Sequence, residues 1–258
     1  MNTKMKNIGL LAITLCLMVG VVGVLLLDPI KQDIGYHRFV DQRMLLGIPN
    51  FWNVISNLPF LVVGCMGLYS IFISRRLVYI TELKITYTLF FLGVSLVAFG
   101  SGYYHLRPDN VSLVWDRLPM TIAFMALFSI IVGEFTSPKL CQFSLWPLLA
   151  FGAFSVVYWY VTESNGEGDL RWYVLVQFLP ILIIPIILTC FKSRYTHTSG
   201  YWYLLGAYVS AKGLEHFDEL INNILFSLSG HSLKHVVAAL GIYFLLKAYN
   251  NRKVIQPL

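Results

Sequence analysis

Two histidines four residues apart, His231 and His235, are the residues whose spacing first suggests chemistry. On a helix, positions i and i+4 share a face and lie roughly 6 Å apart along the axis. Two imidazoles with this spacing can bind one metal ion. The pair therefore predicts a metal-binding helix face near the end of the chain.

The stretch GSGYYHLRPDN at positions 100–110 supplies further groups: Ser101 and His105 are also at i and i+4, and Asp116 follows closely. A third histidine completes a three-histidine site with an open fourth position, as in catalytic zinc sites. Zinc lowers the pKa of its bound water to about 7. Asp116 can take a proton from that water, and Ser101 can donate a hydrogen bond to an oxyanion. The alternative interpretation is that all of these are unrelated polar residues at helix ends.

The composition places these residues in a membrane protein. Of the 258 residues, 57% are hydrophobic and 12% are charged, and the mean hydropathy is +0.68. Ordinary soluble domains carry about 25% charged residues, so we expect the bilayer to be the solvent of this chain. The net charge of +6 comes from basic residues scattered through short loops. No nucleic-acid-binding motif accompanies them, and we expect no nucleic-acid partner.

Apolar runs predict the elements that must position the candidate residues. A helix that crosses the hydrocarbon layer needs about 20 residues. Eight runs reach this length, at 8–27, 50–73, 86–105, 114–133, 143–161, 172–191, 201–225 and 231–249. The short loops between them predict an all-α, polytopic membrane helix bundle. The first run is longer than the apolar region of a signal peptide, about 7–15 residues. We therefore expect an uncleaved anchor helix within 1–30, followed by one transmembrane domain over 36–250.

The positions of lysine and arginine predict the orientation, because basic residues are enriched in cytoplasmic loops. Lys4 and Lys6 precede the first span, and Arg75, Arg76 and Lys84 lie in the loop after the second. The pattern favours both termini in the cytoplasm. With eight spans, all three histidines and Asp116 then fall near the outer face.

Three stretches resemble the alkaline ceramidase family, within a superfamily of seven-helix membrane hydrolases that includes the adiponectin and progestin receptors. They are FWNVISNLPFLVVG (51–64), GSGYYHLRPDNVSLVWDRLPM (100–120) and SGHSLKHVVAAL (229–240). The family signature is a Ser-x-x-x-His pair, an aspartate eleven residues beyond that histidine, and a late His-x-x-x-His pair. All five positions fit, and the similarity extends over residues 36–249.

The resemblance implies a seven-helix core formed by spans two to eight, with the first helix as an addition. It implies that His105, His231 and His235 hold zinc, that Asp116 acts as general base and acid, and that Ser101 stabilises the tetrahedral intermediate. The implied reaction is hydrolysis, within the membrane, of the amide bond of a ceramide-like N-acyl lipid. The products would be a sphingoid base or other amine and a fatty acid, and no obligate protein partner is expected.

One segment departs from the eukaryotic members of that family, which carry an acidic calcium-binding segment before the first core helix. Here the segment GYHRFVDQRMLLGIPN has Asp41 as its only acid, and Asn50 stands where an acidic residue ends the calcium-binding segment. We therefore expect zinc but no calcium. The IPNFWN variant is similar to bacterial members of the family. From this resemblance we expect the protein to lie in a bacterial plasma membrane.

Two alternatives to a hydrolase stay open at this point. A transporter with a histidine-lined path is the weaker one, because the charged residues fall near one face and transport sites usually lie near the middle of the membrane. A receptor-like or regulatory membrane protein would keep a structural zinc site, and Asp116 distinguishes this reading because a structural site needs no base.

A second group of polar residues lies late in the seventh predicted span, where Glu215 and His216 are three and four residues after Lys212. They form either an internal ion-paired network or a wall around the metal, and Asp218 would reach the same cavity if its helix turns it inward.

Overall fold

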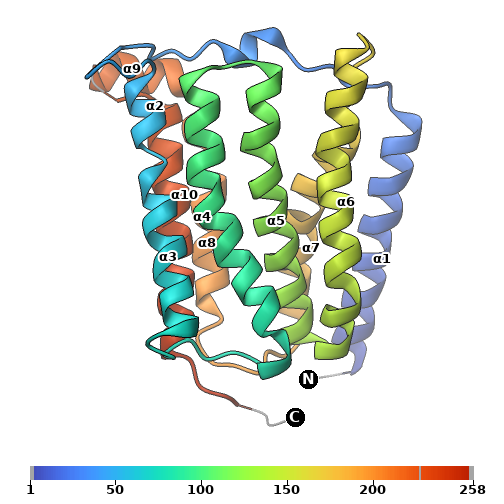
Figure 1. Cartoon of the computed structure of the whole chain (residues 1–258). Helices are drawn as coiled ribbons and strands as arrows, with labels where there is room; N and C mark the ends of the chain where they lie inside the picture. Colours follow the sequence, from blue (N-terminus) through green and yellow to red (C-terminus); the bar gives the residue numbers. More distant parts are fainter. Residues whose placement is uncertain (1–2, 227, 256–258) are drawn as a thin grey trace.

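The computed structural model describes residues 3–226 and 228–255. Figure 1 shows long helices packed side by side into a bundle, with both termini at one end. The opposite end is called the site end below. The helices are α1 (Thr3–Leu26), η1 (Ile34–His37), α2 (Phe51–Ile55), α3 (Leu58–Phe72), η2 (Thr81–Leu83), α4 (Lys84–Leu106), α5 (Asn110–Phe135), α6 (Pro138–Ser164), α7 (Arg171–Cys190), α8 (Ser199–His216), α9 (Asp218–Leu225) and α10 (Gly230–Asn251). The predicted all-α bundle is confirmed.

Six helical segments of the described chain are long and apolar enough to cross a membrane. They are α1, α2 with α3, α4 with η2, α5, α6 and α7, and they correspond to the first six predicted spans. Helices α8 and α10 also run along the bundle (Figure 1), but they carry Lys212, Glu215 and Lys234 and are less apolar. Lys212, Glu215 and Lys234 line an internal cavity together with residues of α4 and α5.

The seventh predicted span, 201–225, is wrong as a single helix. Helix α8 ends at His216, and α9 is a separate short helix that lies across the site end near α2 (Figure 1). No residue of α9 is buried. Its sequence, DELINNIL, holds two acids and two asparagines, which are costly in hydrocarbon. The chain therefore turns out of the bundle at Phe217, and the polar side chains of α9 stay at its end.

The second predicted span contains a break between α2 and α3. Pro59 lies at the start of α3 and has no backbone N–H to continue the hydrogen-bonding pattern of α2. Ser56 and Asn57 form the interruption. At the break the half-buried Ser56 hydroxyl contacts α10, where it lies 2.8 Å from His235 Nδ1.

Helices α4 and α5 approach each other closely near the site end. A Cβ atom on Gly100 would lie 1.9 Å from the backbone oxygen of Trp115, so only glycine fits there. The start of α5 is held by a capping box, in which the Asp109 carboxylate accepts a hydrogen bond from the Ser112 N–H at 2.6 Å. Asp109 is thus a structural residue that sets where α5 begins.

The end of the bundle that holds the termini is joined by a buried ion pair. Arg252 lies 2.7 Å from the Glu134 carboxylate, and the two side chains are 2% and 0% exposed. The Tyr201 hydroxyl donates to the same carboxylate at 2.7 Å, and Arg252 donates to the backbone oxygen of Val78. This network fastens the end of α10 to α5 and lies far along the helices from the histidines.

Candidate metal centre

Three histidines meet at the site end of the bundle. His105 comes from the last turn of α4, and His231 and His235 come from the first two turns of α10. All three are buried, and one potential ligand atom from each lies within 4.8 Å of the others. Their ring centroids are 5.0, 5.1 and 5.2 Å apart, which is nearly an equilateral triangle. The structure therefore brings His105 beside the pair that sequence spacing had predicted, His231 and His235.

The donor atoms of this cluster fit a metal ion. His105 Nδ1 and His231 Nε2 are buried and have no hydrogen-bond partner. A buried polar atom without a partner is costly, so such atoms indicate a missing ligand. Neutral imidazole nitrogens bind zinc at about 2.0–2.1 Å. Three histidine ligands with an open fourth position are one of the known arrangements of a catalytic zinc site. Of the described residues, this trio alone has the geometry to hold a metal.

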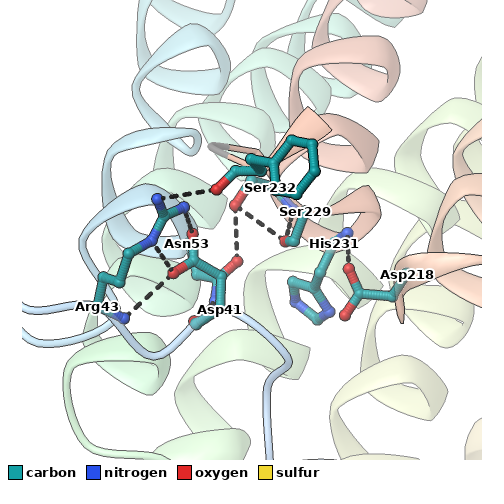
Figure 2. Close-up of polar contacts among 8 residues, drawn as sticks. Asp41, Arg43, Asn53, Asp218, Ser229, His231 and Ser232 are labelled. Carbon is teal, nitrogen blue, oxygen red and sulfur yellow. Dashed lines mark hydrogen bonds and ion pairs between the residues drawn. The ribbon is translucent and has the colours of Figure 1, made fainter. Parts of the chain in front are cut away.

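Each histidine is held by a residue from another segment. Ser56, at the break between α2 and α3, lies 2.8 Å from His235 Nδ1, which leaves Nε2 of that ring available as a ligand. The Asn50 side chain donates to the backbone oxygen of His105 at 2.8 Å. The Asp218 carboxylate accepts a hydrogen bond from the His231 N–H at 2.7 Å, as Figure 2 shows. The Ser56 contact orients the ring of His235, whereas the contacts of Asn50 and Asp218 position the backbone of His105 and His231.

Ser101 and Asp116 lie on the facing sides of α4 and α5, where Gly100 allows the helices to meet. Both residues are buried, and Ser101 is a hydrogen-bonding neighbour of the Asp116 carboxylate. Both also line the cavity that the three histidines line. The structure thus places all five residues of the predicted site around one space.

That cavity has a volume of about 370 Å³. Its wall is polar beside the histidines and apolar elsewhere. The apolar lining comes from six helices and includes Phe60, Val94, Val97, Met120, Ala123, Phe124, Phe178, Leu204, Ala238 and Ile242. A compartment with one polar side and a long apolar wall fits a lipid whose reactive group is polar.

The cluster around Lys212 forms an ion-paired wall of the same cavity. The Glu215 carboxylate pairs with Lys212 at 2.8 Å and, through its other oxygen, with Lys234 of α10. Both of the interpretations offered for this cluster therefore apply, because the network is ion-paired and also lines the cavity. His216 is exposed and outside the metal cluster, and Asp218 contacts the backbone of His231.

The loop before α2 is tied to the start of α10 by a polar network (Figure 2). Arg43 binds the Asp41 carboxylate through two nitrogens, at 2.8 and 2.6 Å. The Asn53 amide donates to the backbone oxygen of Asp41 and accepts from the Ser232 hydroxyl. Ser229 caps α10 by accepting from the Ser232 N–H. This network fixes the helix that carries two of the three histidines.

Acid should weaken this network. The hydrogen bonds from Arg43 hold the pKa of the Asp41 carboxyl below its usual value. A carboxyl with a depressed pKa in the folded state stabilises the fold above about pH 3.9, and the contribution disappears as pH falls through the folded pKa. We expect Asp41→Asn to lower stability at neutral pH and to flatten its dependence below pH 4. Helical circular dichroism of detergent-purified protein measures both, and identical acid transitions in the two proteins would refute the prediction.

The sequence did not identify Ser56, Asn50 or Lys234 as parts of this site, and it offered Asp218 as a residue facing the cavity, whereas Asp218 instead accepts a hydrogen bond from the His231 N–H. The signal for Ser56 was the proline three residues later, which marks the helix break. For Asp218 the signal was a polar segment too hydrophilic for hydrocarbon. Neither signal identifies which distant residue is contacted.

Fold and cluster together define the class of this protein: a multi-pass helical membrane protein with a buried three-histidine group on the wall of an internal cavity. The family model described as Ceramidase matches residues 45–256, and the chain belongs to the ceramidase family. Membership indicates a membrane hydrolase that acts on amide bonds. No curated protein and no solved structure matches the chain.

Proposed function

We propose that this protein is a zinc-dependent intramembrane hydrolase that cleaves the amide bond of ceramide-like N-acyl lipids. The products are a sphingoid base, or another amine, and a fatty acid. The observation that carries the proposal is the placement of three buried histidines, Asp116 and Ser101 around one cavity with a largely apolar wall. Membership in the ceramidase family supports the amide as the reacting group.

In this proposal His105, His231 and His235 hold the metal. Zinc supplies a Lewis acid that polarises a carbonyl and makes water acidic near pH 7. Asp116 accepts a proton from the attacking water and returns it to the nitrogen as the C–N bond breaks. Ser101 donates a hydrogen bond to the carbonyl oxygen as negative charge develops there.

The apolar wall of the cavity takes the acyl chain in this proposal. Helices α5, α8 and α10 supply much of that wall, deeper in the bundle than the histidines. The scissile carbonyl then lies at the polar side of the cavity, between Asp116 and the cluster. A chain bound in this way helps to position the amide for reaction.

We propose an orientation with both termini in the cytoplasm of a bacterial cell and the histidines toward the outer face of the plasma membrane. Lys4 and Lys6 lie in the first turn of α1, and Arg75 and Arg76 follow α3. Figure 1 shows that the start of α1 and the end of α3 are at the end of the bundle that holds the termini. We also propose that α1 is an anchor outside the catalytic domain of 36–250. It contacts mainly α7, buries only Gly9 and Val24, and precedes the matched region.

The test combines metal analysis with hydrolysis assays on the purified full chain. We expect about one zinc per chain and release of fatty acid from at least one class among ceramides, N-acylethanolamines and N-acyl amino acids, followed by mass spectrometry. Zinc-loaded protein that hydrolyses none of these lipids would contradict the proposal. That outcome would favour a receptor-like or regulatory protein with a structural zinc site.

A further inference from the structure

Arg117 is a buried cation that the proposed reaction does not use. It follows Asp116 on α5, lines the same cavity, and is 6% exposed. Its guanidinium is stacked between Trp159 and Tyr173, 4.1 and 4.6 Å from the ring centroids. The Nη2 atom donates to the side-chain oxygen of Gln32 at 2.7 Å. These contacts hold the guanidinium rigidly but leave its charge unpaired.

The other terminal nitrogen of Arg117, Nη1, is buried and has no hydrogen-bond partner. Within the described residues, no aspartate or glutamate oxygen lies within 4.0 Å of an Arg117 nitrogen. The other buried arginine, Arg252, differs because it pairs with Glu134, and the half-buried Arg171 pairs with Asp169. A buried charge without a counter-ion is strongly unfavourable, so a rigid unpaired guanidinium indicates a ligand.

The cavity as a whole also carries a surplus of positive charge. Its lining includes the cations Arg117, Lys212 and Lys234 and the two carboxylates of Asp116 and Glu215. Glu215 is already shared by both lysines. One anionic group on the bound lipid would balance this surplus, and a carboxylate with a single negative charge matches it.

We propose that Arg117 binds a carboxylate that the lipid amide carries on the amine side of its scissile bond, as in an N-acyl amino acid. Gln32, which holds the guanidinium, belongs to the loop between α1 and α2 that crosses the site end (Figure 1). The apolar wall, in contrast, extends away from that end. The head group therefore lies under the loop beside Arg117 and the acyl chain lies deeper. This inference rests on the proposed function and specifies its substrate class.

A binding experiment with lipids that cannot be hydrolysed tests this subsite. The probes are a long-chain keto acid and the keto alcohol of equal length, in which CH₂ replaces the scissile N–H. We expect the wild-type full chain in detergent to bind the acid about tenfold more tightly, because a charge-assisted hydrogen bond is gained. Arg117→Gln should bring the two affinities within about twofold, and Arg117→Lys should retain part of the preference.

Arg171→Gln is the matched control. It removes the same charge near the site end, but Arg171 is paired with Asp169 and does not line the cavity. The control should keep the tenfold preference for the acid. Equal binding of acid and alcohol by the wild type would overturn the proposal, and so would a preference that survives Arg117→Gln. The wild-type comparison decides the matter if Arg117→Gln fails to fold.

Two further arms separate related explanations. If oleate is preferred over oleyl alcohol in an Arg117-dependent way and the keto acid is not, the anion is the released fatty acid, and the head-group assignment is overturned. If wild-type protein hydrolyses N-acylethanolamines and shows no preference for the keto acid, the subsite fails while the proposed function stands. An Arg117-dependent preference without hydrolysis of any amide supports the subsite and contradicts the proposed function.

Discussion

Replacement of His231 by alanine is expected to abolish both bound zinc and amide hydrolysis. His231 is buried, its Nε2 atom has no hydrogen-bond partner, and among the described residues its cluster is the only group of three metal-ligating side chains. Loss of a supporting contact alone typically costs 10–100-fold in metal affinity, and loss of a ligand should cost more than about 100-fold. Zinc content by mass spectrometry and fatty-acid release from the substrates identified above measure the two effects together.

A graded series makes this result specific. Ser56→Ala removes only the hydroxyl that contacts His235 Nδ1, so we expect zinc affinity to fall about 10–100-fold, with activity restored by added zinc. His216→Ala is the matched control, because His216 is exposed at the same end of the bundle and outside the cluster. A His231→Ala protein that remains active without metal would refute the assignment of the ligands.

Asp116→Asn should separate binding of the metal from catalysis. The substitution keeps the size of the side chain and its contact with Ser101 but removes the group that accepts a proton. General acid–base catalysis typically contributes 10²–10⁴-fold, so we expect kcat to fall by roughly that factor. KM and zinc content should change little, because Asp116 is not part of the histidine cluster. Steady-state kinetics beside metal analysis measures the separation.

Asp28→Asn serves as the control for charge, because Asp28 is exposed near the site end and does not line the cavity. It should leave kcat unchanged. If Asp116→Asn instead hydrolyses every lipid amide at the wild-type rate, Asp116 is no base and the amidase mechanism is wrong. The receptor-like interpretation with a structural zinc site would then be favoured.

Most of the helices could be predicted from the sequence because each depends on its own residues. Six apolar runs correspond to helices long and apolar enough to span a membrane, with ends that differ by a few residues. The run 201–225 failed because average hydrophobicity does not register a short polar segment near its end. The polar residues of α9, among them Asp218 and its two asparagines, lie at the end of the bundle. The apolar residues between them therefore lie there as well, outside the predicted span.

The candidate site also has features that the sequence predicts and features that it does not. The i, i+4 spacing of His231 and His235 is a local property of one helix, and the structure keeps it. The convergence of that pair with His105 and Asp116 was predicted from the number of spans, which requires all four to lie at one end. Ser56 and Asn50 escaped prediction, because their roles depend on a helix break and a loop that bring them against specific partners.

The sequence by itself determined the helical class, the membrane-like composition and the residue types available for metal binding and proton transfer. These follow from local periodicity and from the hydrophobic effect, which act along a single segment. Only the tertiary structure decided which ring nitrogens lack partners, which residues hold the histidines, and that Arg117 lies buried without a counter-ion. The physical reason is that these properties depend on how helices rotate and approach one another, as at Gly100, and no single segment encodes such contacts.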